Sequence, residues 1–489
     1  MFSTKCVYNH NMQKKEAFPL LVILSLAALL GAAMLTRGHV WPDDFAAYIM
    51  QARSIVTGDM PGFIVHNTIT IKSSSSQLGP IAYPWGFPLL LAPVYRILGI
   101  SPLGFKLVGL AFFLAFLIVF YLLLRRRFSP TIGLLTVSLF AFNLTLLRFL
   151  DYILSDIPFL FACTLTVLLI DKYATEQVRG LRFPILIGLA LFAGFFLRTP
   201  GILLLFTFLA YQIWRVFLDR ALTKSLALDA LVAVLVFGLL WLISSVIFPG
   251  GQDSYFSHFE EYGFGAESVL RNAKGYFLVL GTFFEGLPGY QIIFWVFVGL
   301  ALLGAAVRLK ADMLFLLAGL PFYVTNALWP EWQGLRFMFP ALPFFVYFAV
   351  QGLQALAGRK HVLVYTALVV LITGLLLSSS GAAWANLRNG RQINGPFDPY
   401  SLALYAFLED ETPPESVIVF FRPRALRLMV DRDAISITQC AQLRRGDFIA
   451  LSKKVGDNLQ IPPEEIEACG LPLAQVYQNR RFVVFEIRD

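Results

Sequence analysis

Apolar segments of membrane-spanning length recur along the first 380 residues of the chain. A helix needs about 20 predominantly apolar residues to cross the hydrocarbon core of a bilayer. Hydrophobic residues make up 57% of the 489 residues and charged residues only 14%, whereas soluble domains carry roughly 25% charged residues. We therefore predict an α-helical polytopic membrane protein with about eleven crossings, some of them short, at residues 18–35, 103–124, 131–147, 157–171, 184–197, 200–217, 227–248, 289–307, 312–328, 337–356 and 361–380.

Lysine and arginine residues gather in alternate loops between these segments, as at residues 125–127, 308–310 and 359–360. Short loops rich in such residues stay in the cytoplasm. A cytoplasmic N-terminus places all of these clusters inside, and it places the C-terminus and a long loop at about residues 36–102 outside. A cleaved signal peptide is the alternative for the first segment, but ten crossings could not hold both the basic clusters inside and an anchored N-terminus.

Residues 381–489 are predicted to form a separate domain outside the membrane, because they hold 27 of the 70 charged residues. Runs rich in Val, Ile and Phe predict strands, and two further stretches have helical character. The expected strands lie at 416–421, 434–437, 447–451 and 481–487, and the expected helices at 399–409 and 463–469. This small extracytoplasmic α/β domain contains no phosphate loop or nucleophile elbow, so its expected role is a lid or packing partner for the membrane part.

The cysteine and histidine residues give little sign of metal chemistry. Cys440 and Cys469 both fall in the exported tail, where they could pair or remain two separate buried thiols. The sequence has no CxxC, no HExxH and no histidine cluster, so we predict neither a metal nor a cofactor. The net charge of +8 comes from the membrane part, where cytoplasmic loops explain it, and it does not predict a nucleic-acid partner.

Two adjacent carboxylates follow the first membrane segment directly, in the stretch Trp41-Pro42-Asp43-Asp44. Proline followed by two acids is a common helix start, because the carboxylates complement the N-terminal dipole. Carboxylates at a membrane face are also where a general base is needed against a lipid-borne substrate. Neighbouring residues on a helix point about 100° apart, so only one of the two is expected to face a site. We favour Asp44, because Asp43 is better placed to serve the first helical turn.

Further motifs occur in a fixed order along the chain. They are Tyr83-Pro84-Trp85-Gly86-Phe87-Pro88, Ser155-Asp156-Ile157-Pro158, Arg198-Thr199-Pro200, Arg336 before Phe337, and the tail stretch at 417–426. Together with the acidic pair, this set resembles the GT-C superfamily of polyprenyl-phosphate-sugar glycosyltransferases. It is most similar to the dolichyl-phosphate-mannose protein mannosyltransferases and the bacterial aminoarabinose lipid A transferases, and the resemblance extends over nearly the whole chain.

The resemblance implies an enzyme that moves a sugar, with inversion, from a polyprenyl-phosphate donor to a lipid, glycan or protein acceptor at the outer face. It implies catalytic roles for Asp43, Asp44 and Asp156. It also implies a donor-phosphate contact at Arg336 and substrate contacts at Tyr48, Tyr83 and Trp85. Related enzymes often carry an acid-Lys-Pro run where this chain has Tyr83-Pro84-Trp85. The phosphate contact of that lysine is therefore unassigned, with Lys72 and Arg198 as the possible substitutes.

Other interpretations stay open at this point. Arg336 and Arg198 could simply extend to the membrane interface, and Asp156 could only cap its helix. A lipid-linked sugar flippase or another transporter would explain the membrane segments, and a scaffold protein would explain the tail. No retention signal occurs, so we expect the inner (plasma) membrane, with membrane lipids around the helices. Neither the sugar nor the acceptor follows from the sequence.

Overall fold

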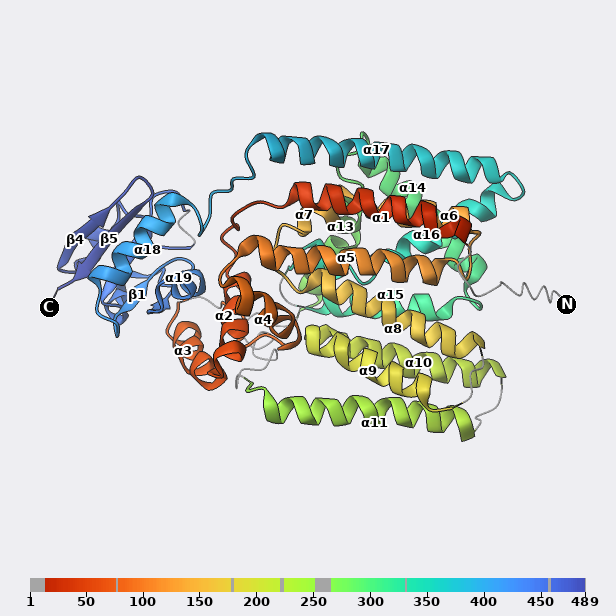
Figure 1. The fold of residues 1–489 in the computed structure, drawn as a ribbon, viewed down its shortest axis with the longest axis horizontal. Coiled ribbons are helices and arrows are strands. Elements are labelled where there is room, and N and C mark those ends of the chain that lie inside the picture. Colours follow the sequence, from red (N-terminus) through yellow and green to blue (C-terminus); the bar gives the residue numbers. More distant parts are fainter. Residues whose placement is uncertain are drawn as a thin grey trace.

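A bundle of long helices carries a smaller α/β unit at one end (Figure 1). The computed structural model describes residues 14–75, 78–176, 180–219, 224–250, 265–329, 332–455 and 459–488. The first thirteen residues, which the topology prediction places in the cytoplasm, lie outside these ranges.

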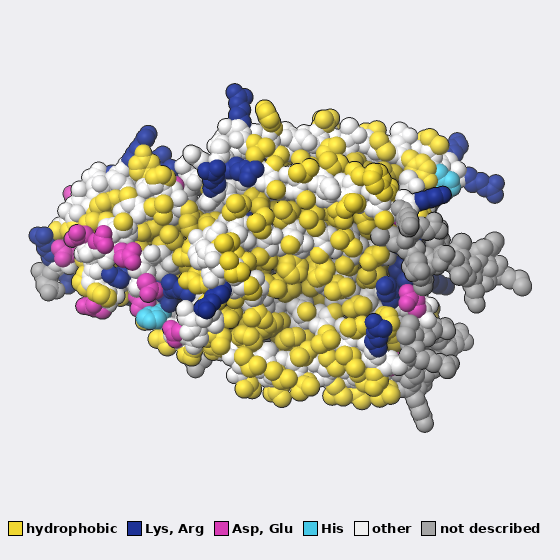
Figure 2. Space-filling model, in the orientation of Figure 1, with side chains coloured by type: hydrophobic (Ala, Val, Ile, Leu, Met, Phe, Trp, Pro, Cys, Tyr) yellow, Lys and Arg dark blue, Asp and Glu magenta, His cyan; other side chains and the backbone are white. Residues whose placement is uncertain are grey.

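Seven described helices are long and apolar enough to cross a membrane. They are α1 (Lys14–Met34), α5 (Pro102–Leu124), α8 (Asp156–Glu176), α10 (Ile202–Asp219), α11 (Lys224–Ile247), α14 (Tyr290–Arg308) and α17 (His361–Arg388). Hydrophobic side chains cover most of the side of the bundle seen in Figure 2, and Val246 and Ile292 are 81% and 73% exposed. Such a surface is stable against lipid and not against water. The prediction of a multi-pass membrane protein is confirmed.

Shorter apolar helices occupy the remaining four predicted segments: α6 (Pro130–Ala141), α9 (Arg182–Leu197), α15 (Met313–Leu328) and α16 (Leu342–Ala357). The segment predicted at 131–147 is not one helix, because Asn143 interrupts it. The Asn143 side chain accepts from the N–H of Leu146 and donates to the carbonyl of Phe283, which starts the separate helix α7 (Leu144–Phe149). Helix α17 runs to Arg388, beyond its predicted end.

Three helices fold the long first loop beside the α/β unit (Figure 1). They are α2 (Asp44–Thr57), α3 (Met60–Lys72) and α4 (Gly86–Leu98). A further helix, α13 (Ala266–Val279), packs along α15 and leads through η2 (Leu280–Phe284) to α14. Two short 3-10 turns, η1 (Thr199–Gly201) and η3 (Leu335–Met338), begin the chain segments that enter α10 and α16.

The α/β unit contains a mixed five-stranded sheet of order β2-β1-β3-β5-β4. Its strands are β1 (Val417–Val419), β2 (Asp433–Ile435), β3 (Phe448–Ser452), β4 (Leu473–Gln478) and β5 (Phe482–Ile487), and β1 is parallel to β2 and β3. All four predicted strands are confirmed. Sequence analysis missed β4, a half-exposed edge strand, and the eight-residue helix α19 (Pro423–Val430). Helix α18 (Pro399–Glu411) is confirmed.

The stretch predicted to be helical at 463–469 holds only the 3-10 turn η5 (Ile466–Cys469). A disulfide joins Cys469 to Cys440, the first residue of the 3-10 turn η4 (Cys440–Arg445), across a Cα–Cα distance of 5.1 Å. Of the two arrangements left open by the sequence, the structure has the paired one. The bond ties these two short turns together.

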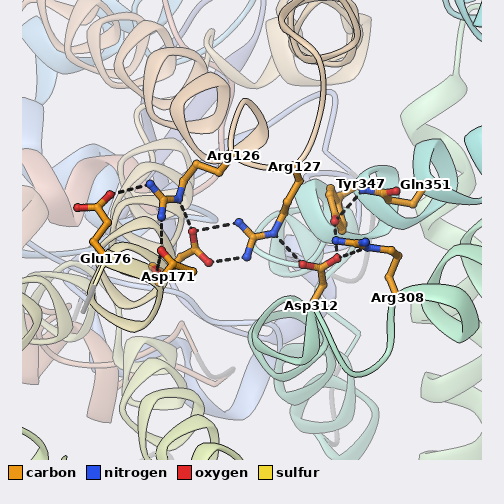
Figure 3. Close-up of polar contacts among 9 residues, drawn as sticks. Arg126, Arg127, Asp171, Glu176, Arg308, Asp312, Tyr347 and Gln351 are labelled. Atoms are coloured by element: carbon orange, nitrogen blue, oxygen red, sulfur yellow. Dashed lines mark hydrogen bonds and ion pairs between the residues drawn. The ribbon is translucent and has the colours of Figure 1, made fainter. Parts of the chain in front are cut away.

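A network of ion pairs and hydrogen bonds joins α5, α8, α14, α15 and α16 at the end of the bundle far from the α/β unit (Figures 1 and 3). Arg126 and Arg127, just after α5, both bind Asp171 of α8. Arg127 also binds Asp312 at 2.8 Å, and Asp312 accepts from Arg308 at 2.7 Å and from Tyr347 of α16 at 2.6 Å. Asp171 and Asp312 are almost fully buried, so these charges are stable only as long as the network stays intact.

We predict that Arg127→Met lowers the melting temperature of the purified protein strongly, because Asp171 and Asp312 each lose one of their cations. Breaking a buried pair costs about 3–5 kcal/mol. We expect a loss near the lower value, because Arg126 still pairs with Asp171 and Arg308 still pairs with Asp312. Arg148→Met is the matched control. Its pair with Glu285 spans 3.3 Å between side chains that are 52% and 49% exposed, and such a pair is worth about 1 kcal/mol or less. Equal losses in the two variants would contradict the prediction.

Candidate active site

An acid and an arginine from distant parts of the sequence meet where the bundle contacts the α/β unit. Asp44 opens α2, and Arg336 lies in η3, 292 residues later. The Arg336 guanidinium lies 3.3 Å from one Asp44 oxygen, and Tyr83 Oη donates a 2.7 Å hydrogen bond to the other. Asp44 and Arg336 are each 25% exposed, so the pair is partly buried but reachable by a ligand.

Gln51 of α2 holds Tyr83 in place beside Asp44. The fully buried Gln51 amide donates to the Tyr83 carbonyl at 2.9 Å and accepts from the Tyr83 N–H at 3.1 Å. An amide that satisfies both backbone groups of one residue fixes the position of that residue. The Tyr83 ring also packs against the ring of Tyr48, with the centroids 4.7 Å apart. The hydroxyl that reaches Asp44 is therefore held from two sides.

A second acid and arginine lie beside this pair. Asp156, the first residue of α8, forms an ion pair with Arg198, which directly precedes η1. Ser155 Oγ lies 3.1 Å from the Tyr48 hydroxyl, which links Asp156 to the aromatic pair around Asp44. Helix capping alone does not describe Asp156, since it also pairs with a cation from another part of the chain.

One phenylalanine ring brings the two arginines together. Arg198 and Arg336 lie 4.8 Å and 5.2 Å from the centroid of the Phe337 ring. A ring face attracts a guanidinium, and the flat geometry of arginine suits such stacking. The two cations can therefore stay close despite their like charge, because each also has its own carboxylate. Two arginines at one partly exposed position can bind the oxygens of a phosphate.

The surroundings of Asp44 keep its carboxylate charged. Burial alone would raise the pKa of Asp44, but Arg336, the Tyr83 hydroxyl and Arg424 together lower it below its ordinary value. Burial alone would lower the pKa of Arg336, but the charges of Asp156 and Asp44 outweigh burial and raise this pKa above its ordinary value. The pKa of Tyr83 is raised well above its ordinary value by burial and by the charge of Asp44, so its hydroxyl remains a hydrogen-bond donor.

Asp43 faces away from this cluster and toward the α/β unit. It is 6% exposed, and Asp43 Oδ1 accepts from the N–H of Ala425 in α19 at 3.4 Å. Burial raises the pKa of Asp43 to about 6, against the opposing effect of Arg424 and Arg422. The adjacent acids thus have different surroundings, as the 100° offset between neighbouring helical residues requires.

A buried lysine joins the two chain segments that carry the acids. Lys106, in the first turns of α5, is fully buried and donates to Asp151 at 2.6 Å and to the Gly38 carbonyl at 2.6 Å. The same Asp151 accepts from the N–H and the hydroxyl of Thr36. Residues 36–38 lead into α2 and Asp44, and Asp151 precedes Asp156. This lysine was not singled out from the sequence, although it is a lone charge in an apolar segment.

Two further predicted site residues lie elsewhere. Trp85 donates from Nε1 to the carbonyl of Pro249 at 2.9 Å and stacks on Phe248, with the centroids 5.6 Å apart. It therefore joins α4 to the end of α11. Lys72 ends α3 and makes no hydrogen bond or ion pair to any described residue. Its proposed part in phosphate binding has no contact with the Asp44 cluster to support it, and Arg198 is the better placed substitute.

The architecture is similar to that of known membrane glycosyltransferases. ArnT from Cupriavidus metallidurans, solved with undecaprenyl phosphate, aligns over 95% of this chain and 97% of its own, with a TM-score of 0.62 and 13% identity. The oligosaccharyltransferase AglB from Archaeoglobus fulgidus, solved with an inhibitory peptide and a dolichol-phosphate, aligns over 90% of this chain and 70% of its own, with a TM-score of 0.57 and 12% identity. No family model and no curated protein sequence matches the chain.

The chain has the GT-C fold. The resemblance inferred from the acidic pair and the later motifs is therefore confirmed at the level of architecture. At 12–13% identity the likeness extends to how the helices are arranged and not to what is bound. In this GT-C fold, the cluster of Asp44, Arg336, Asp156 and Arg198 lies at the bundle end next to the α/β unit (Figure 1).

We predict that Asp43→Asn stabilises the protein at neutral pH. A folded-state pKa of about 6 lies above the ordinary value of 3.8, so folding favours the protonated acid, and stability falls as the pH rises from about 4 through about 6. An amide imitates the neutral acid at every pH. The melting temperature of the variant should exceed that of the native protein at pH 7.5, by the equivalent of roughly 3 kcal/mol, and should match it near pH 4. A lower melting temperature at pH 7.5 would show that the arginines hold Asp43 as a carboxylate.

Proposed function

We propose that this protein is an integral membrane glycosyltransferase that moves a sugar from a polyprenyl-phosphate donor to a lipid, glycan or protein acceptor. The observation that carries the proposal is the Asp44–Arg336 pair, supported by Tyr83 and set beside the Asp156–Arg198 pair. It supplies a fixed base and two cations at one partly exposed place. The likeness in fold to ArnT and AglB supports the same class of reaction.

In the proposed mechanism, Asp44 is the general base. The acceptor hydroxyl attacks the anomeric carbon of the donor sugar, and its proton passes to the Asp44 carboxylate. The bond between the anomeric carbon and the phosphate oxygen breaks, and the polyprenyl phosphate leaves with the electron pair. A single displacement inverts the anomeric centre. Arg336 and Arg198 stabilise the charge that develops on the leaving phosphate, which is where fixed cations contribute most.

In the proposed mechanism, the contact between Asp44 and Arg336 belongs to the enzyme before the donor has bound. Their separation of 3.3 Å and 25% exposure make the contact a weak one that an incoming phosphate can replace. Phosphate binding to Arg336 would then release one Asp44 oxygen to accept a proton. The Tyr83 hydroxyl would keep its bond to the other oxygen and hold the carboxylate in orientation. A base that becomes available only after donor binding fits a reaction in which the donor enters first.

The site would lie at the outer face of the plasma membrane, with the N-terminus inside and the α/β domain outside. Loops after α5, α14 and α16 place arginine and lysine residues at the far end of the bundle, as the prediction from basic loops requires (Figures 1 and 2). An oxidising outer compartment also suits the Cys440–Cys469 bond. The exposed apolar face of the bundle is where a polyprenyl chain would be held.

A lipid-linked sugar flippase is the competing function. Alternating access needs a bundle that opens at either end. The ion network around Arg127 opposes this, because it ties α5, α8 and α16 together where such a protein would open inward (Figure 3). One measurement distinguishes transfer from transport, on the protein in vesicles that contain labelled lipid-phosphosugar. Release of free polyprenyl phosphate indicates transfer, and movement of intact sugar-lipid indicates transport.

We expect Asp44→Asn to lower turnover by roughly 10²- to 10⁴-fold, the usual effect of losing a general base. The amide keeps the shape of the acid but cannot accept a proton. If Asp44 served only its helix start, the change would cost below about 1 kcal/mol and leave the rate intact. The rate of single-turnover transfer distinguishes a general base from a residue that only serves the helix start. Asp59→Asn is the control, because Asp59 caps α3 in the same loop without touching the cluster. Near-native turnover in the Asp44→Asn variant would show that Asp44 is not the general base, and Asp156 would be the next candidate.

We expect Arg336→Lys to weaken donor binding or turnover by about tenfold or more, because an ammonium retains the charge but loses the paired N–H groups that hold phosphate. Arg336→Ala should weaken donor binding or turnover further, because it also removes the charge. Arg271→Lys is a suitable comparison, since Arg271 is an exposed arginine of α13. Native donor affinity and turnover in both Arg336 variants would mean that this arginine only lies at the membrane interface.

A further inference from the structure

The α/β domain places one arginine beneath the loop that carries Tyr83. Arg424 lies in the first turn of α19 and is fully buried. Its two terminal nitrogens donate to the carbonyls of Leu78, at 2.8 Å, and of Pro80. Gly79 lies between these acceptors with a φ of +90°, a conformation that lets both neighbouring carbonyls face the same cation. The arginine therefore fixes the backbone of residues 78–80.

The same guanidinium lies against the Tyr83 ring, 5.6 Å from its centroid. Tyr83 Oη donates to Asp44, so two contacts connect Arg424 to the proposed base. Arg424 does not touch the Asp44 carboxylate itself. Its effect on this carboxylate passes through Tyr83 and through the charge, which is one of the causes that lower the pKa of Asp44.

Other contacts dock the α/β domain independently of Arg424. Asp431 accepts from Arg53 of α2 at 2.9 Å, and Asp433 lies 3.0 Å from the His66 ring of α3. Trp41 packs on Phe420, Phe421 and Phe482, with the centroids 4.9–6.3 Å apart. These contacts lie outside the loop at 78–83. The domain can therefore remain attached when Arg424 is replaced, which makes the role of Arg424 separable from docking.

We propose that Arg424 is a positioning residue for the transfer reaction and that the α/β domain thereby forms part of the active site. The inference rests on the proposed function, in which Asp44 is the general base. It assigns the tail more than the role of a lid or packing partner expected from the sequence. Arg424 holds the loop at 78–83, and the loop holds the Tyr83 hydroxyl against the base.

The charge of Arg424 gives this role a signature that a purely structural role lacks. The charged and titratable groups near Asp44 are Arg336 from η3, Tyr83 from the loop, Arg424 from α19, Tyr48 from α2, and His39 and Asp43 from the segment that leads into α2. Removing one of its two nearby cations raises the pKa of Asp44. A base must be ionised to act, so the acidic limb of the pH–rate profile moves to higher pH. Replacement by lysine keeps the charge and should keep the limb in place.

The test compares Arg424→Gln and Arg424→Lys with Arg432→Gln in the full-length protein. Arg432 also donates to backbone carbonyls, those of Glu409 and Thr412, but within the α/β domain. Three quantities are measured: hydrogen exchange of residues 78–83, kcat and KM for a polyprenyl-phosphate sugar, and the pH–rate profile. For Arg424→Gln we expect faster exchange at 78–83, a kcat lower by ten- to a hundredfold with KM within about threefold, and a shifted acidic limb. Arg424→Lys should lower kcat without moving the limb, and Arg432→Gln should resemble the native protein.

Native kcat and native exchange at 78–83 in Arg424→Gln would overturn the inference. So would a loss of activity in which exchange rises equally in α3 and throughout the domain interface, since Arg424 would then only dock the domain. Failure of the proposed function looks different. A native protein without transfer activity, in which Arg424→Gln still loosens residues 78–83 and leaves α3 protected, would reject the glycosyltransferase and retain the structural link.

Discussion

Charges buried in a low-dielectric bundle must be paired, and this requirement determines where the helices of the protein meet. Among the described residues of the bundle, Asp171, Asp312, Asp156 and Lys106 are almost fully buried, and each contacts an opposite charge from another part of the chain. An unpaired charge at such a place would cost several kcal/mol. The pairs lie in two layers, one at each end of the bundle. The far layer closes the bundle, and the near layer builds the cluster that we assign to catalysis.

The two layers differ in how completely their charges are satisfied. In the far layer, Arg127 binds two carboxylates, and Asp312 accepts from three groups (Figure 3). In the near layer, Asp44 and Arg336 contact each other at 3.3 Å and remain partly exposed. A network with every donor and acceptor paired is rigid, whereas a loosely paired acid and arginine can exchange partners with a ligand. The chemistry is therefore expected in the layer with the weaker contact.

Much of the architecture could be predicted because the bilayer imposes a simple pattern on the sequence. The apolar segments and four of the five strands of the tail were located from composition and periodicity, and the acidic pair was located from its position after the first segment. Asn143 escaped notice, since an asparagine that starts a new helix looks like any polar residue in an apolar run. The different surroundings of Asp43 and Asp44 follow from helix geometry, but which acid faces Arg336 depends on how α2 packs. Arg424 lies within the tail stretch at 417–426 that contributed to the resemblance, but its role could not be predicted, because only tertiary contacts bring the tail beneath the loop at 78–83.

The Cys440–Cys469 bond constrains the order in which the protein is made. A disulfide forms in an oxidising compartment, so with the tail on the outer side, as we propose, its folding would be completed only after its residues have crossed the membrane. Arg424 belongs to this tail, and all the described helices that are long and apolar enough to span a membrane precede it in the sequence. A ribosome-bound or truncated chain would thus contain Asp44, Arg336 and the whole bundle while lacking the support for Tyr83. Such an arrangement would keep the nascent protein inactive toward the lipid-linked sugars around it until export is finished.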